Sequence, residues 1–165
     1  KTSSAPGRTR LVNYFDFGEF VLADLPGYGF AKVSKSEKER WAKTLDSFFK
    51  NKQTIAHVFM LADSRHDPTA DDVQMIKFLN HHIIPFTVVL TKADKLSRMK
   101  LKENVKAIAA DLYMGVENLL PTSAETGLGK EAVLGKIAEV IAAAEASAAE
   151  DESEEDGEEA ELVRE

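Results

Sequence analysis

One stretch decides the fold of this sequence: Phe86-Thr87-Val88-Val89-Leu90-Thr91-Lys92-Ala93-Asp94. Its first five residues are apolar or β-branched on both faces of an extended chain, which is typical of a covered central strand. The polar residues that follow mark the carboxyl end of that strand. Ligands of open α/β sheets bind beyond such ends, so the search for a site begins here.

Short apolar runs alternate with helical patterns on both sides of this stretch, which predicts an α/β domain with a mostly parallel sheet. Two more strands are expected over Val58–Ala62 and Asn118–Pro121. A further pair, Leu11–Phe17 and Glu19–Ala23, is expected to form an antiparallel hairpin across Gly18.

Four helices are expected between and after these strands. Ser34, Thr69 and Ser97 each stand where a side-chain oxygen can cap the first turn of a helix. Apolar residues at helical spacing between Leu134 and Ile141 mark the last helix.

The composition excludes several classes of protein. The 165 residues suit one domain, and the absence of cysteine excludes disulfides and thiolate metal sites. No run of 18 apolar residues occurs. The lack of cysteine suits the reducing cytoplasm, where we expect the protein to be. We also expect it to be a monomer.

Charge divides the chain into two parts. Eleven acidic residues and one basic residue lie between Glu145 and Glu165, so the rest of the chain is mildly basic although the whole has a net charge of −7. The sequence predicts a folded domain over residues 1–143 and a disordered acidic tail over residues 144–165. The tail has two interpretations: it only solvates the chain, or it docks on a basic partner.

The segment Asp24-Leu25-Pro26-Gly27 follows the second hairpin strand. An acidic residue at a strand end can hold Mg²⁺ through a water molecule, and a glycine three residues later lets its backbone N–H approach a terminal phosphate. Taken alone, this pattern is also common in ordinary turns.

The segment Thr91-Lys92-Ala93-Asp94 has more specific chemistry. A carboxylate at Asp94 can accept hydrogen bonds from guanine N1–H and from the exocyclic amine, and adenine offers no such pair of donors. The stem of Lys92 can lie along the base or along a phosphate loop. Thr91 directly follows the strand, and Ala93 separates the two charged residues.

Two weaker segments complete the pattern. After the last strand comes Thr122-Ser123-Ala124, where the backbone N–H of Ala124 could reach guanine O6 and Ser123 could steady the loop. Before the hairpin lies Pro6-Gly7-Arg8-Thr9, where the Thr9 hydroxyl could coordinate Mg²⁺. The four segments together occur in one order at domain-sized spacing and indicate a guanine-nucleotide site with metal ligands Thr9 and Asp24.

The sequence resembles the bacterial GTP-binding proteins known as EngB, YsxC or YihA, over roughly residues 3–141. Three phrases carry the resemblance: Ser4-Ala5-Pro6-Gly7-Arg8-Thr9, Asp24-Leu25-Pro26-Gly27-Tyr28-Gly29-Phe30-Ala31-Lys32-Val33, and Asp63-Ser64-Arg65-His66-Asp67-Pro68-Thr69-Ala70-Asp71-Asp72. The resemblance implies a P-loop GTPase-like three-layer sandwich that binds GTP with Mg²⁺ and hydrolyses it slowly. It also implies a role in assembly of the large ribosomal subunit, with normal cell division and septation depending on it.

Carried over position by position, the resemblance assigns a first mobile switch to five consecutive residues, Gly7, Arg8, Thr9, Arg10 and Leu11. Asp24, Leu25, Pro26 and Gly27 are expected to meet the γ-phosphate. The base is expected to lie between residues 91–94 and residues 122–124.

The chain departs from this family in one respect: no G-x-x-x-x-G-K-[ST] phosphate loop occurs in it. The family keeps this loop before the first switch, between a first strand and a first helix. We therefore expect a G domain that is incomplete at its N-terminus, with a strand missing from mid-sheet between Val58–Ala62 and Glu19–Ala23. Weak GTP binding by the chain as it stands follows from this expectation.

Catalysis is the least defined part of the prediction. Tyr28 stands where many GTPases place a water-orienting Gln, so the sequence leaves the catalytic residue unknown. The alternative function is a non-catalytic ribosome- or RNA-binding module that retains the fold without turnover. A basic cluster at residues 32–43 suits contact with ribosomal RNA, and equally suits a solvated helix face.

A charged cluster follows the predicted strand Val58–Ala62. Asp63, Arg65, His66 and Asp67 resemble an acid–base group. Because a proline and a threonine come next, the favoured interpretation is a structural turn that leads into a helix.

Overall fold

The structure is a computed structural model that describes residues 12–27, 35–49 and 55–162. It divides into two compact units, Lys1–Lys130 and Glu131–Glu165. The candidate site belongs to the first unit, so each unit is described by itself.

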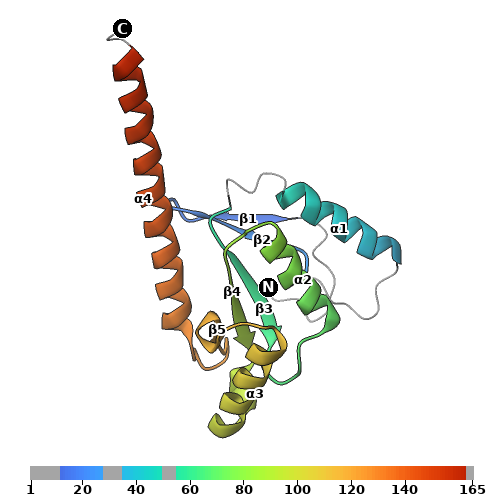
Figure 1. The fold of residues 1–165 in the computed structure, drawn as a ribbon. Coiled ribbons are helices and arrows are strands. Elements are labelled where there is room, and N and C mark those ends of the chain that lie inside the picture. Colours follow the sequence, from blue (N-terminus) through green and yellow to red (C-terminus); the bar gives the residue numbers. More distant parts are fainter. Residues whose placement is uncertain (1–11, 28–34, 50–54, 163–165) are drawn as a thin grey trace. The chain divides into compact units, whose positions relative to one another are not determined.

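A parallel sheet of three strands forms the centre of the first unit (Figure 1). Its strands are β3 (Val58–Asp63), β4 (Phe86–Thr91) and β5 (Leu119–Pro121), in the order β3-β4-β5. β4 lies in the middle, and its four inner residues are buried. The prediction of a covered central strand is therefore confirmed, as is the α/β class with a mostly parallel sheet.

Three helices bury apolar side chains in the same core as this sheet: α1 (Lys35–Phe49), α2 (Ala70–His81) and α3 (Arg98–Asp111). Between α3 and β5 lies the short 3-10 helix η3 (Val116–Asn118). The most enclosed members of the core are Leu79, Val88, Leu90 and Ile108. This core fixes the strand ends that carry the site.

Local sequence determines where the helices begin. The Thr69 hydroxyl accepts a hydrogen bond from the Asp72 backbone N–H, and the Asp72 carboxylate accepts one from the Thr69 backbone N–H, which forms a capping box. The Ser97 hydroxyl accepts from the backbone N–H of Lys100 at 3.2 Å. Both predicted caps are confirmed, while Ser34 lies outside the described residues.

The predicted hairpin forms a separate sheet of two antiparallel strands, β1 (Asn13–Asp16) and β2 (Val21–Asp24). Its turn is closed by a 3.0 Å hydrogen bond from Phe17 N–H to the Phe20 carbonyl, with Gly18 at φ 84°. Within the described residues, no strand pairs with the second edge of β2 or of β3.

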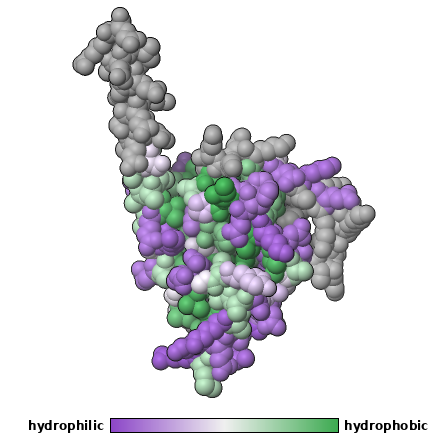
Figure 2. All heavy atoms as spheres, in the orientation of Figure 1, coloured by the Kyte–Doolittle hydropathy of each residue, from purple (hydrophilic) through white to green (hydrophobic). Residues whose placement is uncertain are grey.

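Several large apolar side chains reach the surface of the first unit. Leu61 of β3 is 62% exposed, and five others belong to the hairpin, namely Tyr14, Phe15, Phe17, Val21 and Leu22. On the face drawn in Figure 2, apolar patches alternate with hydrophilic ones. The hairpin therefore contributes little to the core, unlike β4.

The second unit is formed by α4 (Lys130–Leu162), which begins at the last residue of the first unit. The sequence predicts a disordered tail over residues 144–165, whereas the structure continues the helix to Leu162. The physical reason is that this segment consists largely of Ala and Glu, which have high helix propensity and need no core to form a helix. None of the helices in the described part of the chain has the length and apolar character of a membrane span.

Candidate guanine-nucleotide site

The loops that follow β4 and β5 are joined by backbone hydrogen bonds. Ala93 N–H donates to the Thr122 carbonyl at 2.9 Å, and Thr122 N–H donates to the Leu90 carbonyl at 2.7 Å. Lys92 adopts a left-handed conformation, with φ 60° and ψ 29°, and leads into the 3-10 helix η2 (Ala93–Lys95). The structure thus brings residues 91–94 and 122–124, predicted from separate motifs, to one edge of the sheet.

Asp94 lies at the centre of this edge. Its side chain retains 11% of its accessible surface, and its Oδ2 atom lies 2.8 Å from Lys95 Nζ. The Lys95 ammonium, followed by a hydrogen bond from Ser123, lowers the pKa of the Asp94 carboxyl below its usual value. Asp94 is therefore an ionised, largely enclosed hydrogen-bond acceptor at neutral pH.

Ser123 organises the loop after β5. Its side chain is buried, and its hydroxyl oxygen accepts hydrogen bonds from the backbone N–H groups of Glu125 at 3.2 Å and Thr126 at 3.1 Å. Ala124 is exposed, and within the described part of the chain its backbone N–H donates to no protein acceptor. The loop therefore has a fixed shape and one N–H group available to a ligand.

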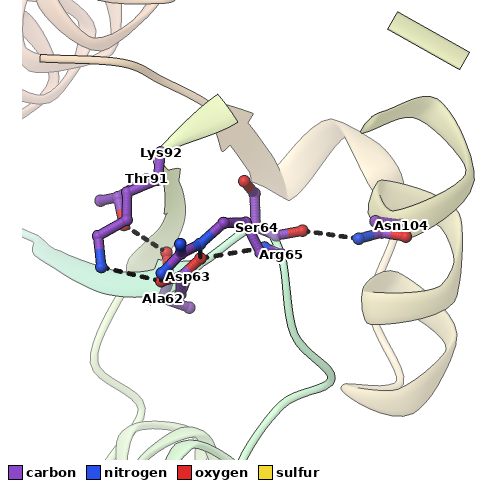
Figure 3. Close-up of polar contacts among 7 residues, drawn as sticks. All are labelled: Ala62, Asp63, Ser64, Arg65, Thr91, Lys92 and Asn104. Carbon is purple, nitrogen blue, oxygen red and sulfur yellow. Dashed lines mark hydrogen bonds and ion pairs between the residues drawn. The ribbon is translucent and has the colours of Figure 1, made fainter. Parts of the chain in front are cut away.

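The ends of β3 and β4 are joined by an ion-pair cluster (Figure 3). Asp63 accepts hydrogen bonds from Arg65 Nε at 2.8 Å, from Arg65 Nη2 at 2.7 Å and from Lys92 Nζ at 3.0 Å. The Arg65 guanidinium, with a further contribution from Lys92, holds the pKa of the Asp63 carboxyl far below its usual range. Lys92 is thereby fixed at its tip as well as at its backbone.

Backbone groups reinforce this junction. Ser64 N–H donates to the Thr91 carbonyl at 3.0 Å, and the Thr91 hydroxyl donates to the Ala62 carbonyl at 3.0 Å. From α3, the Asn104 amide donates to the Ser64 carbonyl at 2.9 Å (Figure 3). Asp63 also accepts from the backbone N–H of Arg65, which confirms the structural turn predicted for this cluster.

The predicted phosphate and metal residues form a second group on the hairpin sheet. Asp24 ends β2, is exposed, and accepts a 3.4 Å hydrogen bond from the Asn13 amide. Leu25 packs against the core, Pro26 is buried and Gly27 is exposed. The predicted switch residues, including the metal ligand Thr9, lie outside the described residues.

Of the two predicted metal ligands the structure therefore describes only Asp24. Within residues 12–27, 35–49 and 55–162, no three His, Cys, Asp or Glu side chains come together in a way that could hold a metal ion. A single exposed carboxylate is nonetheless compatible with Mg²⁺, which usually takes one or two carboxylates and completes its shell with waters and phosphate oxygens.

The sequence of this chain matches those of known proteins. Residues 1–92 match the family model described as 50S ribosome-binding GTPase. A protein of Anoxybacillus flavithermus named probable GTP-binding protein EngB is 41% identical over 139 residues, which cover 83% of this chain and 72% of that protein. The protein of the same name in Pelotomaculum thermopropionicum is 46% identical over 136 residues, covering 81% of this chain and 69% of the relative.

The chain belongs to the EngB family of GTP-binding proteins. A crystal structure of a probable GTP-binding protein engB has the same fold, with a TM-score of 0.70 at 23% identity over 84% of this chain and 86% of that one. The fold is also shared by Era in complex with MgGDPNP and a segment of 16S ribosomal RNA. That match has a TM-score of 0.57 at 17% identity over 82% of this chain and 46% of Era.

In this EngB-family chain, sequence reasoning missed two charged residues next to the motifs predicted to bind guanine. Lys95 directly follows Asp94, and its ammonium also lies 3.6 Å from Glu125 of the loop after β5. The signal available in the sequence was a basic and an acidic residue, each adjacent to one of the two motifs. Because the two are 30 positions apart, only the parallel pairing of β4 with β5 shows that they meet.

Proposed function

We propose that this chain recognises guanine nucleotides at the edge where β4 and β5 end. The observation that supports this most directly is the enclosed Asp94 carboxylate in a loop that is hydrogen-bonded to the loop of the exposed Ala124. A carboxylate can accept from guanine N1–H and from the exocyclic amine, while an amide N–H can donate to O6. Adenine would offer neither group a partner on the base, at a high cost in binding free energy.

The phosphates are proposed to lie toward the second group of residues. Asp24 would hold Mg²⁺ together with Thr9, and Gly27 would offer its backbone N–H to the γ-phosphate, aided by the switch residues 7–11. The ion would supply neutralisation of the phosphate charge. Slow hydrolysis of GTP is proposed from the resemblance alone, and the residue that orients the attacking water is not assigned.

The cellular role proposed is assembly of the large ribosomal subunit, in contact with ribosomal RNA and proteins, by a cytoplasmic monomer. Support comes from the matching family, whose description is 50S ribosome-binding GTPase. The dependence of cell division and septation on this protein would follow as a consequence of ribosome supply.

The test is a titration of the full chain with fluorescent GDP, with and without Mg²⁺, followed by competition with unlabelled GDP and ADP. Release of inorganic phosphate from GTP is measured in parallel. We expect GDP to compete at a concentration at least about 100-fold below that of ADP, because two charge-assisted hydrogen bonds are at stake. Equal competition by GDP and ADP would contradict the proposed function.

A further inference from the structure

Lys95 forms a bridge between the two loops of the base edge. Its ammonium lies 2.8 Å from Asp94 Oδ2, in the loop after β4, and 3.6 Å from Glu125 Oε2, in the loop after β5. The side chain of Lys95 is 51% exposed and that of Glu125 is 74% exposed, whereas Asp94 is nearly enclosed. The bridge therefore runs from the surface to the base-selecting carboxylate.

The Asp94 carboxylate has enough acceptor positions for both the protein and a base. An ionised carboxylate offers about four lone-pair positions on two oxygens. Lys95 occupies one of them on Oδ2, and Ser123 supplies a second protein hydrogen bond. About two positions remain, and guanine presents two donors, N1–H and the exocyclic amine.

The charges of the bridge support one another. Asp94 raises the pKa of the Lys95 ammonium, with a smaller contribution from Glu125. The Lys95 ammonium in turn lowers the pKa of the Asp94 carboxyl. An ammonium contact at one oxygen and a hydroxyl contact from the buried Ser123 leave the carboxylate little freedom to rotate.

We propose that Lys95 is a positioning residue for guanine recognition: it fixes the orientation of the Asp94 carboxylate so that both oxygens face the base, and Glu125 holds Lys95 in place. This inference rests on the proposed function and adds a residue outside the four motifs. A competing role, in which Lys95 blocks Asp94 until a base displaces it, predicts the opposite effect of removing the lysine.

The experiment compares GDP with inosine diphosphate, which lacks the exocyclic amine and so needs only one oxygen of Asp94. Binding of both nucleotides is measured for the full chain and for Lys95→Met. With Lys95 removed, the carboxylate can rotate, and GDP loses more than inosine diphosphate does. We expect the ratio of the affinity for GDP to the affinity for inosine diphosphate to be about tenfold lower in Lys95→Met than in wild type.

Three further variants serve as controls. Lys100→Met removes an exposed lysine that forms an ion pair with Glu103 on α3, and it is expected to leave the ratio unchanged. Lys95→Arg keeps the positive charge, and its affinity ratio is expected to stay close to that of wild type. Glu125→Gln is expected to lower the ratio less than Lys95→Met, because the Lys95–Glu125 contact is longer and more exposed.

A second measurement needs no nucleotide. In the free chain, the side-chain carboxyl ¹³C resonance of Asp94 is followed by NMR as the pH is lowered. Lys95→Met should raise the pKa of Asp94 toward its usual value, and Lys100→Met should not. An unchanged Asp94 titration in Lys95→Met would overturn the proposal, whether or not the chain binds nucleotide.

The binding outcomes separate the two proposals. If wild type prefers GDP to ADP but Lys95→Met weakens GDP and inosine diphosphate equally, Lys95 is only structural and the positioning role is lost. If Lys95→Met binds GDP more tightly, Lys95 competes with the base and the positioning role is again lost. If wild type does not prefer GDP to ADP, the proposed function fails and the role of Lys95 fails with it.

Discussion

The two groups of residues that carry the candidate site lie on sheets of opposite character. β4, which precedes Asp94, has four of its six residues buried, whereas all four residues of β1 and three of the four in β2, which precedes Asp24, are exposed. The base edge is also joined by backbone hydrogen bonds between two loops. On the proposed function, the residues that would bind the base are held in place by the protein's own core, while the phosphate side would rest on a hairpin with little support from the described residues.

The largest effect expected from this comparison is on stability. Leu90→Ala in β4 removes a fully buried side chain and should lower the free energy of unfolding by about 2–5 kcal/mol. Leu22→Ala in β2 removes the same atoms from a side chain that is 41% exposed, and should lower it by less than about 1 kcal/mol. Urea denaturation followed by circular dichroism measures both, and equal losses would contradict the comparison.

A smaller effect is expected at the glycines of the loop after β5. Gly127 and Gly129 both have positive φ, at 76° and 75°, but only at Gly129 would an added Cβ meet the Pro121 carbonyl oxygen. Gly129→Ala should therefore destabilise the chain by about 1–2 kcal/mol more than Gly127→Ala, which carries only the conformational strain. The comparison uses the same denaturation assay, and an equal loss in the two variants would show that the loop can shift away from the strand end.

The smallest effect concerns the ion-pair cluster. Because the pKa of Asp63 is lower in the folded chain than its ordinary value of 3.8, its contacts stabilise the fold above that pH, and this contribution is lost as the pH falls below it. Asp63→Asn should reduce the free energy of unfolding by about 1 kcal/mol at pH 7 and by progressively less below pH 3.8.

The control for this prediction is Asp67→Asn, which removes a carboxylate from an exposed neighbouring residue. Denaturation curves recorded at several pH values compare the two variants with the wild type. A loss of stability in Asp63→Asn that does not change with pH would show that packing, rather than the ionised carboxylate, matters at this position.

Much of the base edge could be predicted from the sequence because its signals are local. The apolar run 86–90, the caps at Thr69 and Ser97, and the polar residues after β4 and β5 each reflect short-range chemistry. The rule that parallel strands end at one edge then placed residues 91–94 beside residues 122–124, and the structure confirms that they meet.

The other features of the site could not be predicted because they depend on contacts between residues that are far apart in the sequence. The pairs Lys92–Asp63 and Lys95–Glu125 link residues about 30 positions apart, and their geometry follows only from strand register. The division at residue 143 and the acidic tail remain predictions, and α4 extends to Leu162 through a segment rich in Ala and Glu, which have high helix propensity. The predicted switch at residues 7–11 lies outside the described residues and remains a prediction.

The most direct test of whether Asp94 selects guanine is a substitution that should change which base the chain prefers. In Asp94→Asn, the amide oxygen can still accept from N1–H, but the amide NH₂ must donate to the base, which suits the C2 carbonyl of xanthine and not the amine of guanine. Competition by GDP and xanthosine diphosphate is measured for both proteins. Wild type should prefer GDP, and Asp94→Asn should prefer xanthosine diphosphate. An unchanged preference for GDP in the variant would contradict the assignment of Asp94 as the base selector.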